Sequence, residues 1–253
     1  MTKLYIAVPT HSNMVTVDTA ICVLELERTL PKIGILTKTA FHSSSMISHL
    51  RNTIIAHFLI EDATHVLMVD SDQSVPVSLV DRMIKFDKPL VGVIYPRRTY
   101  ALHQVRYHET HLDPETFLKQ ALHFVGELET DTKGEIQILN GFARAKNIGT
   151  GAILIRRDTI EKMIAHYPEL FGTGFPDGAE YEALRYNNWG FFNPYTKQYQ
   201  STNSGEDVSF CDRWTQIGGE IWADVVTNTV HVGRHAYTGN FLDHVNALNG
   251  STV

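Results

Sequence analysis

The chain has 253 residues, a length that favours one α/β domain, or one domain with an appended lobe, over two full domains. Its composition of 43% hydrophobic, 20% charged and 10% aromatic residues is that of a folded globular protein and excludes collagen-like, coiled-coil and disordered chains. The formal net charge of -6, from 22 basic and 28 acidic residues, argues against a nucleic-acid binder, because a broad phosphate-binding face needs a basic surplus.

The sequence predicts a protein that stays inside the cell. No stretch approaches the roughly 20 apolar residues that a membrane helix needs, and the apolar start ends at Pro9-Thr10, too soon for a secretion signal. The two cysteines, Cys22 and Cys211, stand in apolar-periodic stretches typical of reduced core thiols. We therefore expect a cytoplasmic location and no integral membrane segment, while the oligomeric state stays open.

The first hundred residues alternate between short buried strands and helices. The predicted elements are a strand over 4–8, helices over 17–24 and 47–58, a strand over 66–69, a helix over 79–84 and a strand over 90–94. This order, β, α, α, β, α, β, predicts a mostly parallel sheet with helices on both faces. In such sheets the ligand site lies beyond the carboxyl ends of the strands.

The rest of the chain is less regular. From 100 to 147 the periodicity weakens, and the polar run over 127–135 predicts the turn of an inserted hairpin. Alternation resumes with a strand over 152–155, a helix from Asp158, a helix opening at Ser204 and a strand over 220–226, followed by His231. The segment 171–200 is rich in Gly, Asn, Tyr and Phe, which is typical of a loop that covers a site.

Two carboxylates directly follow the predicted strand over 66–69. Asp70 and Asp72 share one side, because residues two apart in an extended chain face the same way. Hard oxygen ligands suit Mg²⁺ or Mn²⁺, and a metal held there would also bridge substrate phosphates. Acidic residues are common in turns as well, but a buried strand that delivers both to the ligand crevice favours the metal site.

Other polar residues allow both a functional and a structural interpretation. Arg51 is either a ligand-binding residue or an ordinary exposed helix residue. Arg97 and Arg98 are either phosphate-binding residues or a solvated strand end, and His231 is either a ligand or a packed or surface histidine. Ser204, followed by Asp207 three residues later, is close to a capping box.

Taken together, these residues resemble the GT-A glycosyltransferases. The motifs that carry the likeness are Pro9-Thr10, Arg51-Asn52, Asp70-Ser71-Asp72, Tyr95-Pro96-Arg97-Arg98, Gly149-Thr150-Gly151, Glu206-Asp207 and His231. They span most of the chain, although 100–147 and 171–200 match no pattern of the family. The resemblance implies a GT-A-like, Rossmann-type α/β fold in one catalytic domain, with a nucleotide-binding half over 1–99, the hairpin over 100–147 and a small acceptor-side half over 148–253.

The resemblance also implies a role for each motif. Asp70, Asp72 and His231 would hold Mn²⁺ or Mg²⁺ on the diphosphate of a nucleotide-sugar. The residues implied to bind this donor are Pro9, Thr10, His11, Arg51, Asp70, Ser71, Asp72, Arg97, Arg98 and Gly151. Asp207, next to Glu206, would take the proton of the acceptor hydroxyl in an inverting reaction. In a retaining reaction it would orient the acceptor or stabilise an oxocarbenium-like centre.

We therefore expect a metal-dependent glycosyltransferase that moves a sugar from a nucleotide-diphosphate sugar, with UDP-sugars preferred on family grounds, to a glycan, lipid-linked or other hydroxyl acceptor. A nucleotidyltransferase of sugar phosphates also uses such a sheet, but the stretch Pro9-Thr10-His11-Ser12 lacks the Gly-rich basic loop that it normally shows. In a non-catalytic nucleotide- or sugar-binding module the carboxylates would only cap loops. The aromatic residues expected either to stack on acceptor sugars or to pack in the core are Tyr186, Trp189, Phe191, Phe192 and Tyr195.

Overall fold

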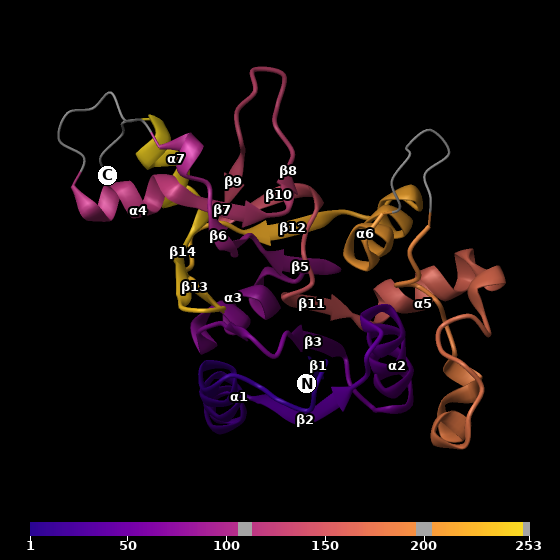
Figure 1. Ribbon diagram of the computed structural model, residues 1–253. Coiled ribbons are helices and arrows are strands. Elements are labelled where there is room, and N and C mark those ends of the chain that lie inside the picture. Colours follow the sequence, from indigo (N-terminus) through magenta and orange to yellow (C-terminus); the bar gives the residue numbers. More distant parts are fainter. Residues whose placement is uncertain (106–112, 196–203, 250–253) are drawn as a thin grey trace.

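The computed structural model describes residues 1–105, 113–195 and 204–249. They form an α/β fold in which a mixed central sheet is flanked by helices, with two small antiparallel sheets beside it (Figure 1). Positions 106–112 of the expected hairpin and 196–200 of the expected covering loop lie outside the described residues.

The central sheet contains β1 (Thr2–Thr10), β2 (Ile35–Ser43), β3 (His65–Val69), β5 (Leu90–Val93), β8 (Glu127–Leu128), β9 (Ile138–Leu139), β10 (Phe142–Asn147), β11 (Ala152–Arg156) and β12 (Ile221–Asp224). The small sheets contain β4 (Gln73–Ser74), β13 (Thr229–Val232) and β14 (Ala236–Gly239), and β6 (Tyr95–Tyr100) with β7 (Leu122–Val125). The helices are α1 (Val17–Thr29), α2 (Ile47–Ile60), α3 (Val77–Phe86), α4 (Pro114–Ala121), α5 (Arg157–His166), α6 (Glu206–Gln216) and α7 (Phe241–Asn249).

The direction of the strands confirms the expected fold class. The sheet order is β2-β1-β3-β11-β5-β12-β10-β8, and β1 pairs in parallel with both β2 and β3, as β12 does with β5. β11 runs antiparallel between β3 and β5, and β10 runs antiparallel beside β12. Strands β3 and β5 are almost continuous apolar runs because both of their faces are buried. The carboxyl ends of β1, β3, β5 and β12 therefore lie at one edge of the sheet.

A strand separates the first two helices, contrary to the order expected from the sequence. β2 pairs with β1 in parallel over nine residues, from Ile35 opposite Thr2 to Ser43 opposite Thr10. Only Ile35 of this strand is buried. The strand lacks an apolar run because it stands at the edge of the sheet, where one side of its backbone has no neighbouring strand.

Helix α1 buries the face opposite to the apolar row that predicted it. Its buried residues are Thr19, Cys22, Val23 and Leu26. Val17, Ile21 and Leu24 are instead 73%, 51% and 68% exposed. Both sets recur at helical spacing, so the periodicity predicts the helix correctly but does not identify which face meets the sheet.

The segment 100–147 contains more than a hairpin. The turn expected in 127–135 does form, since the Gly134 amide donates to the Asp131 carbonyl at 3.0 Å, and it projects from the sheet between β8 and β9 (Figure 1). The residues before it build α4 and β7, and β7 pairs with β6. The division of the chain into donor-side and acceptor-side halves stays a prediction.

Two neighbouring histidines, His42 of β2 and His57 of α2, make stability depend on pH. The Tyr5 hydroxyl lies 2.7 Å from His42 Nε2, and the His42 and His57 rings are 4.7 Å apart between centroids. Burial, and then His57, lower the pKa of His42 from 6.5 to about 4. Because the pKa of this histidine is lower in the folded protein, its contribution to stability is complete above pH 6.5 and is lost as the pH falls toward 4.

We expect the free energy of unfolding to fall by about 2 kcal/mol between pH 7 and pH 4 through His42, after allowance for its partial exposure. The His42→Gln variant keeps a polar partner for Tyr5 but does not titrate, so it should lose this part of the pH dependence. Urea unfolding of both proteins at several pH values measures the difference. Equal pH dependence in the two proteins would contradict the assignment.

Candidate active site

Several of the predicted site residues lie close together where β1 and β3 end. Ala7 pairs with Met68, so Pro9 of β1 and Asp70, the first residue after β3, lie at the same level. The loop after β1 is tied to the loop after β3, because the Thr16 amide donates to the Ser71 carbonyl at 2.8 Å. Two neighbouring strand ends thus form one wall, in the place where ligands bind in open α/β sheets.

The residues at the end of β1 differ in how accessible they are. Thr10 is buried, and its hydroxyl donates to the His42 carbonyl at 3.2 Å. His11 is exposed. The nucleotide-binding role of Pro9, Thr10 and His11 stays a prediction.

Arg51 joins three elements at this edge. Its Nη2 lies 2.9 and 3.2 Å from the two oxygens of Asp70, its Nε lies 3.5 Å from Glu206 Oε1, and its Nη1 lies 3.4 Å from the Thr150 carbonyl. The residue is only 2% exposed, so its interpretation as an ordinary exposed helix residue is wrong. Burial raises the pKa of Asp70, and the charge of Arg51 opposes that rise.

We expect Arg51→Met to destabilise the fold by about 3 kcal/mol, because Asp70 and Glu206 then keep their partly buried charges without a cation. Chemical denaturation at pH 7 measures the loss. In the double variant Arg51→Met, Asp70→Asn one of the uncompensated charges is gone, so it should recover part of the stability. A single variant as stable as the wild type would show that Arg51 does not hold the cluster together.

Asp72 meets residues from two distant parts of the chain. Its Oδ2 lies 2.9 Å from Arg98 Nη1 and 3.5 Å from His231 Nε2. His231 arrives there because β13 pairs with β4, which places it opposite Gln73. Although burial alone would raise it, His231 and Arg98 together hold the pKa of Asp72 below its usual value. Arg97, by contrast, is exposed on the same strand near His123.

The environment of His231 suits a metal ligand. Its Nδ1 lies 2.8 Å from the Pro96 carbonyl and so donates to it, which leaves Nε2 as the ring nitrogen that faces Asp72; Nε2 hydrogen-bonds Asp72 when it carries a proton and offers its lone pair to a metal when it does not. Metal-binding histidines usually donate their other ring N–H to a carbonyl or carboxylate in this way. A nitrogen lone pair and a carboxylate oxygen that face each other fit a divalent cation between them.

The expected third ligand is engaged elsewhere. Both oxygens of Asp70 contact Arg51. In the described part of the chain, no group of three or more His, Cys, Asp or Glu side chains is placed to hold a metal ion. The set Asp70, Asp72 and His231 therefore stays a prediction, of which the structure brings two members together.

Tyr95 stands in one of the motifs that carry the family resemblance, but no role was predicted for it. Its ring lies against Gly149 and Gly151, where an added Cβ would come within 2.3 and 2.7 Å of Tyr95 atoms. The same ring meets His231 edge to face, with centroids 5.5 Å apart. The Gly151 carbonyl accepts the Asp70 amide at 2.8 Å. The two glycines of this motif thus make room for the ring that supports His231.

Glu206 and Asp207 are the first two residues of α6, and the N-cap is Gly205. The predicted capping box is wrong, because Ser204 precedes the N-cap and no side chain caps this helix. The Asp207 carboxylate instead accepts the amide of Val208 at 2.7 Å. Burial, and then the charge of Glu206, raise the pKa of Asp207.

The aromatic residues of the expected covering loop divide into two groups. Phe191 and Phe192 are fully buried, and Phe192 stacks on Phe210 of α6 at 4.3 Å, so they pack in the core and do not offer faces to a sugar. Tyr186 is 71% exposed. The Tyr195 hydroxyl donates to Asp212 at 3.1 Å.

Asn52, which follows Arg51 on α2, fastens this segment. Its amide nitrogen donates to the Gly174 carbonyl at 3.0 Å and to Asn193 Oδ1 at 2.9 Å, and its oxygen accepts the Phe192 amide at 2.8 Å. Asn52 is completely buried. The segment is therefore attached to α2 beside the candidate site.

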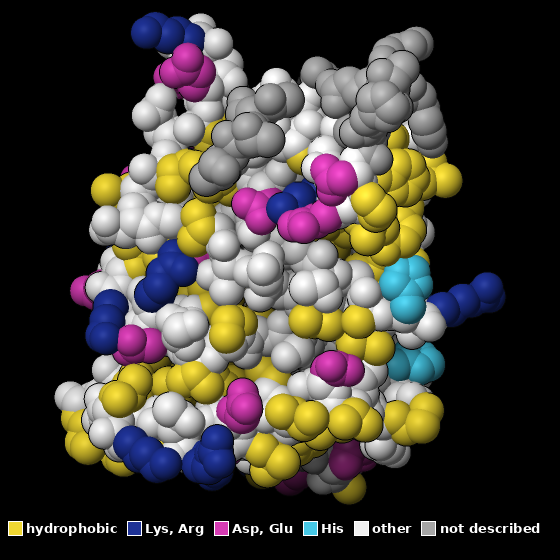
Figure 2. Space-filling model, turned by 90° about the vertical axis from the view of Figure 1, so that its left-hand side faces the viewer, with side chains coloured by type: hydrophobic (Ala, Val, Ile, Leu, Met, Phe, Trp, Pro, Cys, Tyr) yellow, Lys and Arg dark blue, Asp and Glu magenta, His cyan; other side chains and the backbone are white. Residues whose placement is uncertain are grey.

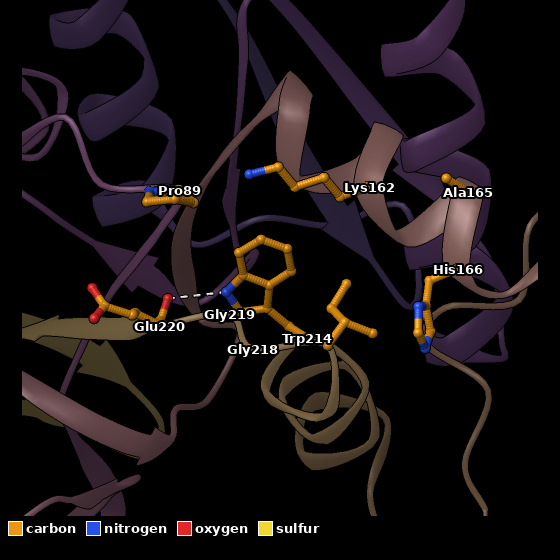
Figure 3. A pocket seen from close by; sticks show the side chains of 9 residues that line it. Pro89, Lys162, Ala165, His166, Trp214, Gly218, Gly219 and Glu220 are labelled. Carbon is orange, nitrogen blue, oxygen red and sulfur yellow. Dashed lines mark hydrogen bonds between the residues drawn. The ribbon is translucent and has the colours of Figure 1, made fainter.

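A cavity of ≈ 500 Å³ lies at the opposite edge of the sheet, beneath the start of β5 and β12 (Figure 3). Lys162 and His166 project from the last turns of α5, and the Trp214 indole donates to the Glu220 carbonyl at 3.0 Å. The carboxyl ends of α5 and α6 meet there, and their dipoles disfavour an anionic ligand. None of the predicted site residues lines this cavity.

The visible surface carries no broad basic face (Figure 2), as expected from the excess of acidic over basic residues in the sequence. On the face shown in Figure 2, Lys and Arg side chains are scattered among acidic and apolar ones. No helix among the described residues is long and apolar enough to cross a membrane.

No family model matches this sequence, and no curated protein matches it. Among solved structures the chain is similar to A197 from STIV, with a TM-score of 0.46 and 14% identity over 92% of this chain and 86% of that one. It is also similar to UDP-glucose pyrophosphorylase solved with UDP-glucose, with a TM-score of 0.42 and 11% identity over 99% of this chain and 98% of that one. A third similar structure is HddC from Yersinia pseudotuberculosis, with a TM-score of 0.38 and 10% identity over 99% of each chain. Identities this low concern the fold alone.

Proposed function

We propose that this chain is a metal-dependent glycosyltransferase of the cytoplasm that takes a sugar from a nucleotide-diphosphate donor, with UDP-sugars preferred, and transfers it to a hydroxyl of a glycan or lipid-linked acceptor. The observation that carries the proposal is the meeting of Asp72, His231 and Arg98 at the end of β3. A carboxylate, an imidazole lone pair and a guanidinium suit a divalent cation and a diphosphate bound together.

In this proposal Asp72 and His231 hold Mn²⁺ or Mg²⁺, and Asp70 adds negative charge close by. When bound, the metal would supply Lewis-acid stabilisation of the diphosphate, which is the leaving group when its bond to the sugar breaks. Arg98 would bind oxygens of the same diphosphate, because its guanidinium lies beside Asp72, at 2.9 Å from the carboxylate. Tyr95 fixes the ring of His231, and Arg51 keeps Asp70 and Glu206 in place.

Asp207 is the proposed general base. Burial, and then the charge of Glu206, raise the pKa of Asp207. A carboxylate whose pKa is closer to neutral pH is a stronger base and so a better proton acceptor. The Val208 amide occupies Oδ1, which leaves Oδ2 to take the acceptor proton. Arg51 holds Glu206 beside it, so the orientation of this acidic pair depends on the same guanidinium that binds Asp70.

The proposal is tested by incubating the protein with a panel of UDP- and GDP-sugars, with Mn²⁺, Mg²⁺ or a chelator, and measuring the nucleotide released. Metal-dependent release of UDP or GDP supports a glycosyltransferase. Formation of pyrophosphate from UTP and a sugar 1-phosphate, without release of UDP from UDP-sugars, would assign the chain to the nucleotidyltransferases. Metal-independent binding without turnover would make it a binding module.

A further inference from the structure

Exposed apolar side chains are concentrated around one edge of the molecule. Half of the large apolar residues that are exposed in the described chain lie between residues 14 and 47. They are Met14, Val17, Ile21, Leu24, Ile33, Leu36, Phe41, Met46 and Ile47. This stretch contains α1, the edge strand β2 and the start of α2, which lie together at the lower end of the view in Figure 1. In Figure 2 apolar side chains are visible over this lower part of the molecule, interspersed with charged ones.

Helix α1 carries apolar residues on two opposite faces. One face packs on the segment after β3, where the Thr19 hydroxyl donates to the Gln73 carbonyl at 2.8 Å and the Cys22 thiol donates to the Val75 carbonyl at 3.2 Å. Val17, Ile21 and Leu24 stand on the opposite face, because they lie one helical turn apart in a row, and each is at least half exposed. A helix that is apolar on both sides is typical of one that is covered on both sides.

Strand β2 offers a second reason for a partner at this edge. Among the described residues it pairs with β1 alone, along its full length, so its outer backbone groups are free to extend the sheet. The strand contains neither proline nor glycine. Lys38 is its only Lys, Arg, Asp or Glu residue, and it is paired with Glu61. Natural edge strands usually carry bulges, prolines or several charges that prevent such pairing.

We propose that a second copy of this chain covers this edge, with β2 pairing antiparallel to the β2 of the copy about a two-fold axis. The side chain of Glu27 on α1 contacts the hydroxyls of Thr37 and Thr39 on β2, so α1 lies close to the edge. Strands are about 4.8 Å apart, which places the two copies of α1 roughly 10–15 Å from each other. Phe41 shares a face of β2 with Thr37 and Thr39, and it fills the space between the helices.

The charges of α1 are complementary to those of the α1 of a second copy that runs in the opposite direction. Asp18 lies near the start of α1 and Arg28 near its end. Neither forms an ion pair within the described residues. A two-fold axis makes the helices antiparallel, so Arg28 of each copy approaches the acidic start of the other.

Two other occupants of this edge fit the structure less well. A peptide that only added a strand to β2 would leave Val17, Ile21 and Leu24 exposed. An anionic membrane is disfavoured by the acidic Asp18 and Glu25 beside this row.

The size of the edge agrees with a specific dimer. A nine-residue strand is about 30 Å long, and a helix layer plus a sheet layer is about 20 Å deep, so roughly 600 Å² of each partner is covered. That lies at the lower end of the range for specific, stable interfaces, which is about 600–1,000 Å² per partner. The inference does not depend on the proposed activity.

Sedimentation analysis of the full chain tests the proposal. The wild type should be a dimer at about 100 µM, and Leu24→Lys and Phe41→Lys should each weaken association at least about tenfold. Leu102→Lys is the control, because Leu102 is 50% exposed on a distant turn and should not affect the dimer. Circular dichroism confirms that each variant is folded.

A charge exchange tests the antiparallel arrangement itself. Arg28→Asp should weaken the dimer, and the double variant Arg28→Asp, Asp18→Arg should restore it, because the reversed pair again has opposite charges across the axis. A wild type that is monomeric at about 100 µM, including one that binds anionic vesicles instead, overturns the proposal. So does a dimer that tolerates Leu24→Lys, one that Leu102→Lys weakens equally, or a double variant no better than the single one.

Discussion

Asp72→Asn is expected to weaken Mn²⁺-dependent binding of UDP by at least about 100-fold, because loss of a direct ligand costs no less than loss of a supporting group, which costs about 10–100-fold. The substitution keeps the shape of the side chain and removes its charge. Isothermal titration of UDP into the protein, with and without Mn²⁺, measures the effect. His231→Ala should weaken the metal dependence less, since a neutral ligand contributes less charge.

Asp62→Asn is the matched control for this measurement. Asp62 is an exposed aspartate that pairs with Lys3 far from the candidate site, so its loss should leave UDP binding unchanged. If Asp72→Asn binds UDP as tightly as the wild type, and Mn²⁺ increases the affinity for UDP equally in both proteins, Asp72 is not a metal ligand. Its contacts with Arg98 and His231 are then only structural.

Asp207→Asn is expected to reduce sugar transfer by about 10² or more, the scale of general-base catalysis, while donor binding and the melting temperature stay near the wild type. The structural reason is the hydrogen bond from the Val208 amide at 2.7 Å, which an asparagine oxygen accepts as well. The substitution therefore removes the proton acceptor and keeps the local fold. Steady-state transfer and thermal melting of the same preparation measure both quantities.

The control for Asp207 is the same substitution at another helix start. Asp113 caps α4 by accepting the amides of Glu115 and Thr116, and asparagine caps almost equally well. Asp113→Asn should therefore change neither transfer nor stability. A variant at 207 that melts early but transfers normally per folded molecule would leave Asp207 with a structural role at the start of α6.

Most strands and helices of the first hundred residues could be predicted because local patterns determine them. Buried parallel strands are continuous apolar runs, so the position of Asp70 directly after β3 could be read from the chain. The edge strand β2 was missed because it has only one buried residue. The face of α1 was missed because both of its sides are apolar, and the sheet that selects one side is formed by residues far away in the chain.

The burial of Arg51 could not be predicted from its neighbours. Its partners Asp70 and Glu206 are 19 and 155 positions further along the chain, and only the folded sheet brings them together. The same holds for His231, which reaches Asp72 through the pairing of β13 with β4. Sequence patterns indicate which residues carry suitable chemistry, whereas long-range pairing decides which of them meet.

Arg51 and Asn52 are consecutive residues of α2 that serve opposite sides of the site. Arg51 holds the carboxylates of Asp70 and Glu206, and Asn52 holds the backbone at residues 174 and 192. One turn of α2 therefore contacts both the acidic residues Asp70 and Glu206 and the backbone at residues 174 and 192. A movement of this turn of α2 would therefore act on the acidic cluster and on the backbone of residues 174–192 at the same time.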